Sequence, residues 1–121
     1  MANPFVHIEL QTTDLKKARD FYARLFDWKL EDSQVPGFGT YTMIGVGEGT
    51  GGGMIASQSP GVPSHWLAYV NVDDVASATR KAKELGAKVV LDVTPVADMG
   101  KMSILVDPTG AHLGLWQTTR G

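Results

Sequence analysis

Cysteine is absent from this chain of 121 residues. Its absence excludes a disulfide framework, a thiolate metal site and a cysteine nucleophile. Long apolar runs are missing too, since no stretch approaches the roughly 18 apolar residues that a membrane-spanning helix needs. The first residues, MANPFVHIEL, lack a basic segment followed by an apolar run. We therefore expect no signal peptide and no membrane partner, and we predict a cytoplasmic location.

An excess of charge of either sign is also missing. The formal net charge is -2, and charged residues make up 20% of the chain. A balance of this kind creates no field that would select nucleic acid or an anionic membrane, so neither is expected as a partner. The hydrophobic share of 43% is ordinary for a soluble globular protein. The length fits one domain over residues 1–121.

The chain does contain a helical pattern that occurs twice. Asp14 and Asp74 each precede an amphipathic stretch and are candidate N-caps. Gly86 is expected to end the second helix in the left-handed conformation. The apolar residues have the same spacing in both halves, and we expect them to face the core: Leu15, Ala18, Tyr22 and Leu25 in the first half, and Val75, Ala78, Ala82 and Leu85 in the second.

Strand-like segments surround both helical stretches in the same order. The segment 58–64 contains two prolines and a glycine and is predicted to link module 1–57 to module 65–121. The pattern predicts an α+β fold made of two βαβββ modules. The predicted strands are 6–11, 28–31, 39–45 and 53–57 in the first module, and 66–72, 88–93, 100–106 and 112–117 in the second.

Three segments carry a resemblance to a known family: HIELQTTDLKKARDFYARLFDW (7–28), YVNVDDVASATRKAKELGAKVV (69–90) and DPTGAHLGLW (107–116). In this order they resemble the glyoxalase/bleomycin-resistance/extradiol-dioxygenase superfamily, also called the vicinal oxygen chelate superfamily. The resemblance implies that the two modules form a cup-shaped mixed sheet with the helices outside and the active site in the concavity. It also implies pairing of two chains as a homodimer.

Alternation along the strands predicts which side chains face away from the helices. Val6, Ile8 and Leu10 are expected to pack under a helix, which leaves the intervening residues on the opposite face. Such a face could bind a small planar or aromatic molecule, or it could simply be exposed to solvent. The candidate ligand-binding residues are His7, Glu9, Gln11, Tyr69, Asn71, His112 and Trp116, together with Leu67.

The resemblance also implies four metal-ligand positions. They match His7, then Gly53 or Met54, then Leu67 and Gly114, and of these only His7 is a usual ligand. Glycine, leucine and methionine lack the donors that zinc, nickel or iron prefer. No cofactor is therefore expected. The alternative is a divalent metal in an unusual set of ligands, for which His65 and His112 are candidates.

Two classes of function follow from these observations. The first is a family protein without the usual metal site that binds a small molecule. The second is an enzyme, either a lyase or isomerase similar to lactoylglutathione lyases or a dioxygenase-related protein. It would be metal-dependent or would use His7 and Glu9 as acid–base groups. The sequence leaves open whether the protein is catalytic.

Overall fold

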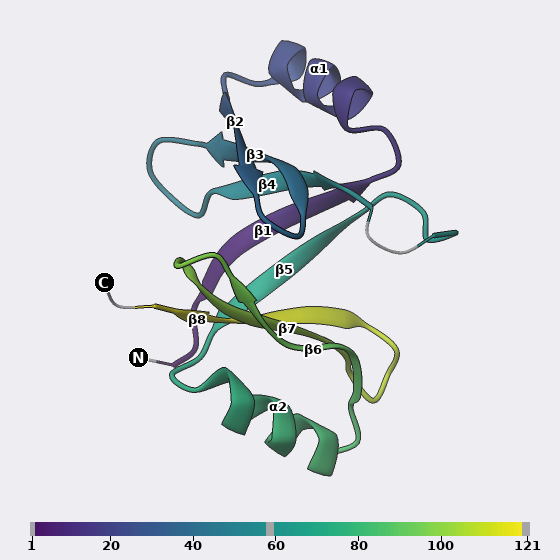
Figure 1. The fold of residues 1–121 in the computed structure, drawn as a ribbon. Helices are drawn as coiled ribbons and strands as arrows, with labels where there is room; N and C mark the ends of the chain where they lie inside the picture. Colours follow the sequence, from purple (N-terminus) through teal and green to yellow (C-terminus); the bar gives the residue numbers. More distant parts are fainter. Residues whose placement is uncertain (1, 58–59, 120–121) are drawn as a thin grey trace. The chain divides into compact units, whose positions relative to one another are not determined.

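The computed structural model describes residues 2–57 and 60–119, so Gln58 and Ser59 of the predicted linker lie outside the described residues. Two compact units divide the chain. The N-terminal unit is His7–Leu67, and the C-terminal unit comprises Ala68 onward together with the residues up to Val6. The element order confirms the α+β class and the repeated βαβββ arrangement (Figure 1). Within the described part of the chain, no helix is long and apolar enough to cross a membrane.

The N-terminal unit holds β1 (Phe5–Thr12) from His7 onward, α1 (Leu15–Leu25), β2 (Lys29–Val35), β3 (Gly39–Gly45) and β4 (Gly52–Ala56). Its strands lie in the order β2-β3-β4-β1, and the β1–β4 pair is parallel. Asp14 begins α1 as predicted, because its carboxylate accepts a hydrogen bond from the Lys17 amide at 3.0 Å. The helix packs on a buried cluster of Leu10, Ile44 and Met54.

The C-terminal unit holds most of β5 (His65–Asn71), then α2 (Val75–Glu84), β6 (Lys88–Val96), β7 (Gly100–Val106) and β8 (His112–Thr118). Its strand order is β5-β8-β7-β6, with β5 and β8 parallel. Asp74 caps α2 through the Ser77 amide, and Gly86 follows the helix at φ +105°, both as predicted. The buried core residues are Val75, Leu105 and Leu115.

Three residues predicted to face the helix-side core are exposed instead. Leu25 lies ten residues after Leu15, which rotates it by about 80° from that residue around a helix of 3.6 residues per turn. Leu85 is the C-cap of α2 and lies outside the helix itself. Val6 is exposed because β1 pairs with β4 only from Ile8 onward.

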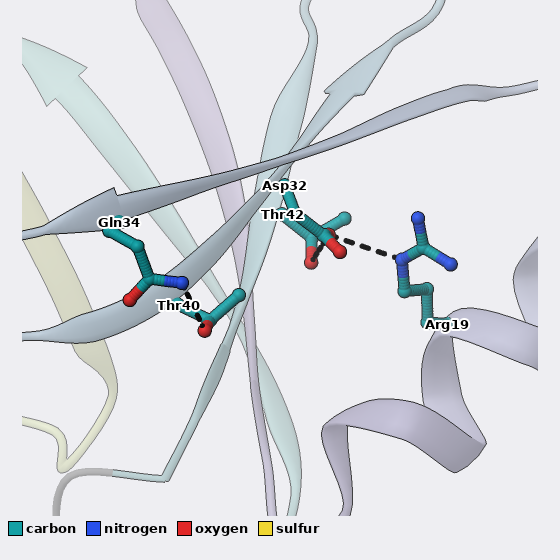
Figure 2. Close-up of polar contacts among 5 residues, drawn as sticks. All are labelled: Arg19, Asp32, Gln34, Thr40 and Thr42. Atoms are coloured by element: carbon teal, nitrogen blue, oxygen red, sulfur yellow. Dashed lines mark hydrogen bonds and ion pairs between the residues drawn. The ribbon is translucent and has the colours of Figure 1, made fainter.

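Polar side chains connect α1 to the outer strands of its unit (Figure 2). The hydroxyl of Thr42 donates to Asp32 Oδ1 at 2.7 Å, and Arg19 Nε donates to the same oxygen at 3.1 Å. The Thr42 hydrogen bond and, to a lesser degree, the charge of Arg19 hold the pKa of Asp32 below its ordinary value, against an opposing effect of burial. Nearby, Gln34 Nε2 donates to Thr40 Oγ1 at 2.8 Å.

Candidate functional site

The polar face of β1 is largely buried. Leu10 packs under α1, so the alternating residues His7, Glu9 and Gln11 point to the other side of the sheet. Glu9 and Gln11 are each only 9% exposed, and His7 is half-buried. Buried polar groups of this kind need hydrogen-bond partners, because leaving them unsatisfied is costly.

Tyr41 on β3 joins these residues into one hydrogen-bonded cluster. Its hydroxyl oxygen lies 2.6 Å from His7 Nε2 and donates to Glu9 Oε2 at 3.0 Å. Gln11 Nε2 donates to the other carboxylate oxygen of Glu9, also at 3.0 Å. The structure thus brings three predicted site residues together around a fourth that the sequence analysis missed. We call these four residues the Tyr41 cluster: His7, Glu9, Gln11 and Tyr41.

The absence of a side chain at Gly53 leaves room for Tyr41. Gly53 on β4 pairs with Glu9 on β1 and with Met43 on β3. A Cβ atom at Gly53 would overlap the ring and hydroxyl of Tyr41. The tyrosine therefore fills the space that a ligand-bearing side chain at this position would occupy.

The C-terminal unit repeats this relation at Gly114. A Cβ atom there would overlap the ring of Tyr69, which lies on the paired strand β5. Tyr69 is only 2% exposed, and its hydroxyl donates to Met102 Sδ at 3.4 Å. The second glycine at a family ligand position is thus also covered by a tyrosine ring.

The other predicted residues of the C-terminal unit are more open. Trp116 is half-buried, and its indole N–H donates to Thr118 Oγ1 at 3.0 Å. Asn71, the pairing partner of Trp116 on β5, is also half-buried. His112 is exposed at the start of β8. Their role as ligand-binding residues stays a prediction.

The charge state of His7 follows from its surroundings. Burial lowers the pKa of His7 below its usual value of 6.5, and the negative charge of Glu9 offsets this only in part. The imidazole is therefore predominantly neutral at pH 7 and carries a single N–H. A neutral imidazole beside a tyrosine and a carboxylate is suited to hydrogen bonding and proton transfer.

The side chains at the four family ligand positions do not fit a metal ion. Met54 is fully buried in the core under α1, so Gly53 is the residue that faces the Tyr41 cluster. Leu67 is buried and apolar, and Gly114 has no side chain. His7 alone offers a usual donor, and its Nε2 contacts Tyr41.

A replacement set of ligands is not found elsewhere among the residues that the structure describes. Over residues 2–57 and 60–119, no three His, Asp or Glu side chains are grouped so that they could hold a metal ion. His65, an alternative candidate, has its Nδ1 at 2.9 Å from the Pro63 carbonyl oxygen. The donor chemistry therefore gives no support to a divalent metal, and no step of the proposed function uses one.

Comparison with known proteins places this fold in a family. The family model described as "Glyoxalase/Bleomycin resistance protein/Dioxygenase superfamily" matches residues 5–115. The chain belongs to this superfamily. A protein of Mycobacterium tuberculosis (strain CDC 1551 / Oshkosh) named "Putative glyoxylase CFP32" is 38% identical over an alignment of 117 residues, which covers 93% of this chain and 45% of that protein. The Streptomyces peucetius "Anthracycline biosynthesis protein DnrV" is 25% identical over 127 residues, covering 90% and 45%.

This chain therefore spans about half the length of these relatives. Among solved structures, a hypothetical protein, BH1468 from Bacillus halodurans C-125, matches with a TM-score of 0.74 and 18% identity over 100% of this chain and 98% of that one. Methylmalonyl-CoA epimerase from Mycobacterium tuberculosis matches with a TM-score of 0.70 and 12% identity over 96% and 88%. At these identities the likeness shows the fold alone.

Proposed function

We propose that this protein binds a small organic molecule at the Tyr41 cluster, without a metal ion at the superfamily's ligand positions. The observation that carries the proposal is the place of Tyr41. Its ring takes the space of a side chain at Gly53, and its hydroxyl contacts both His7 and Glu9. A metal-ligating side chain at position 53 and this tyrosine ring cannot occupy the same space.

An aromatic or planar ligand is the class that we favour. The other residues predicted from the sequence, Tyr69, Asn71, His112 and Trp116, belong to the C-terminal unit, and their part in ligand binding stays a prediction. Aromatic side chains can stack on a planar ligand, and a few polar groups fix its orientation. The name of the Streptomyces peucetius relative adds support, since anthracyclines are polycyclic aromatic compounds.

An enzyme is the second candidate function, and one observation favours it. His7, Tyr41 and Glu9 form a continuous hydrogen-bonded chain that could move a proton. Lyase or isomerase chemistry of the glyoxalase kind would then proceed through acid–base groups. The relative named as a glyoxylase is consistent with this candidate.

Elemental analysis of protein purified without a histidine tag tests the metal-independent proposal. We expect no stoichiometric zinc, nickel or iron, and no rise in melting temperature when these ions are added. The same measurements on His7→Ala and His65→Ala identify the ligands if a metal does bind. Stoichiometric metal that is lost in His7→Ala would contradict the proposal.

A second experiment separates binding from catalysis. A panel of planar aromatic compounds is titrated while the fluorescence of the tryptophans is followed, and turnover of the hemithioacetal of methylglyoxal and glutathione is assayed with a chelator present. Saturable binding without turnover supports the binding protein. Turnover that resists the chelator and is lost in Tyr41→Phe supports the metal-independent enzyme instead.

A further inference from the structure

The hydroxyl of Tyr41 lies between two groups but has only one proton to donate. Glu9 Oε2 accepts that proton at 3.0 Å, so the hydroxyl has none left to donate to His7. The 2.6 Å contact between Tyr41 and His7 Nε2 must then have the imidazole as its donor. The hydrogen bonds run in one direction, from His7 through Tyr41 to Glu9.

We propose that Tyr41 is a positioning residue that keeps the proton of neutral His7 on Nε2 and links the imidazole to the negative charge of Glu9. The inference rests on the proposed function, because it concerns the same cluster. With Nε2 protonated, Nδ1 is the ring nitrogen that carries the lone pair. His7 can therefore accept a hydrogen bond or a proton only at Nδ1.

The link to Glu9 favours the acceptance of a proton by His7. When His7 gains a proton, the new positive charge is stabilised through the Nε2–H bond to Tyr41 and, beyond it, by the carboxylate. Charge-assisted hydrogen bonds of this kind are stronger than neutral ones. Gln11 holds the other oxygen of Glu9 and so keeps the carboxylate in place. An aspartate performs the comparable task for the histidine of serine proteases.

The positions of these side chains are set by strand pairing rather than by a loop. His7, Glu9 and Gln11 alternate along β1, and β1 pairs with β4 from Ile8 to Thr12. On the far side of β4, Tyr41 pairs with Ile55, so its ring reaches across Gly53 toward β1. Sites built on paired strands hold their groups more accurately than sites on loops.

Proton and nitrogen NMR of the ligand-free chain tests this inference directly. In the wild type we expect the His7 proton on Nε2, protected from exchange with water, and a hydroxyl proton signal from Tyr41. In Tyr41→Phe, which keeps the ring over Gly53, the protection of the Nε2 proton should be lost. Tyr22→Phe makes the same chemical change on α1 and should leave the His7 signal unchanged.

A double-mutant cycle then tests the link to Glu9. Glu9→Gln should shift the Nε2 proton resonance when Tyr41 is present and should have little effect in the Tyr41→Phe background. Equal shifts in both backgrounds, or a wild-type His7 with its proton on Nδ1, would overturn the inference. If Tyr41→Phe does not fold, the ring nitrogen that carries the His7 proton in the wild type still tests the inference. Because no ligand or added metal enters these spectra, the result is independent of the tests of the proposed function.

Discussion

A single methyl group at position 53 should be enough to disturb the Tyr41 cluster. In Gly53→Ala, the new Cβ would overlap the ring of Tyr41 and would force it away from His7 and Glu9. Overpacking of this kind typically costs about 1–3 kcal/mol. We expect the urea midpoint of unfolding to fall accordingly, together with loss of the protected His7 proton.

Gly45→Ala is the matched control for this change. Gly45 also lies in a strand of the N-terminal unit, but its Cβ would find the Lys29 carbonyl oxygen at 3.6 Å, an ordinary contact distance. We expect a small effect on stability, within about 0.5 kcal/mol. Equal destabilisation by the two substitutions would show that overlap with the Tyr41 ring is not the cause of the effect at Gly53.

Asp32 makes the stability of the N-terminal unit depend on pH. Its folded-state pKa lies below the ordinary value of 3.8, chiefly because Thr42 donates to it, so the unfolded state binds more protons in that range. The stabilising contribution is complete above about pH 5 and is lost as the pH falls through the folded-state pKa. In Thr42→Val we expect the urea midpoint to fall less between about pH 5 and pH 3 than in the wild type.

Arg19→Gln provides the comparison. The guanidinium of Arg19 contributes less than Thr42 to the lowered pKa of Asp32, and the ion pair is exposed, with side-chain exposures of 41% and 46%. In Arg19→Gln, the dependence of the urea midpoint on pH should change less than it does in Thr42→Val. A larger change in Arg19→Gln would mean that the ion pair with Arg19, rather than the hydroxyl of Thr42, is the main cause of the lowered pKa of Asp32.

At the scale of elements, the two helices begin in the same way. Asp14 and Asp74 each accept a hydrogen bond from the amide three residues later. Replacing such a cap by alanine costs about 0.5–2 kcal/mol. We expect Asp74→Ala to lower the thermal midpoint, while the neighbouring exposed Asp73→Ala leaves it nearly unchanged. Equal effects of the two substitutions would argue for loss of charge rather than loss of the cap.

Most elements were predictable because their buried faces follow a period. The two helices begin directly after the predicted N-caps Asp14 and Asp74, and the strand Gly39–Gly45 has the predicted range. The strand predicted at 28–31 extends as Lys29–Val35, because residues 32–34 are exposed on an edge strand and show no apolar alternation. The strand predicted at 88–93 continues to Val96 through Pro95. A proline is tolerated there because β6 is an edge strand and has register shifts.

The candidate site was predictable only in part. Alternation along β1 correctly placed His7, Glu9 and Gln11 opposite Leu10. The same alternation in Gly39–Gly45 puts Tyr41 opposite Ile44 and could have identified it as a member of that face. What alternation cannot supply is the register between strands, which brings the ring over Gly53 and the hydroxyl between His7 and Glu9. That contact depends on pairing between residues far apart in sequence.

At the scale of the whole molecule, several large apolar side chains in the described part of the N-terminal unit are exposed. We call four of them the α1 surface: Phe21, Leu25, Phe26 and Trp66, which are 57%, 56%, 44% and 40% exposed. Ring contacts through Tyr22 connect Phe21, Phe26 and Trp66. Clusters of exposed large apolar side chains usually mark an interface.

A second copy of this chain is the partner that we predict for the α1 surface. Lys17 and Arg24 lie on α1 together with Asp20, and such a mixture of charges allows a helix to pair with its own copy across a two-fold axis.

Sedimentation velocity over a range of concentrations measures this association. We expect a dimer for the wild type and a monomer for Phe21→Glu, because the new charge would be buried in the interface without a partner. Leu85→Glu changes a leucine of the C-terminal unit that is even more exposed, at 69%, and this variant should remain a dimer. A dimer that survives Phe21→Glu would locate the interface elsewhere. A wild type that stays monomeric would mean that the α1 surface does not pair with a copy of itself.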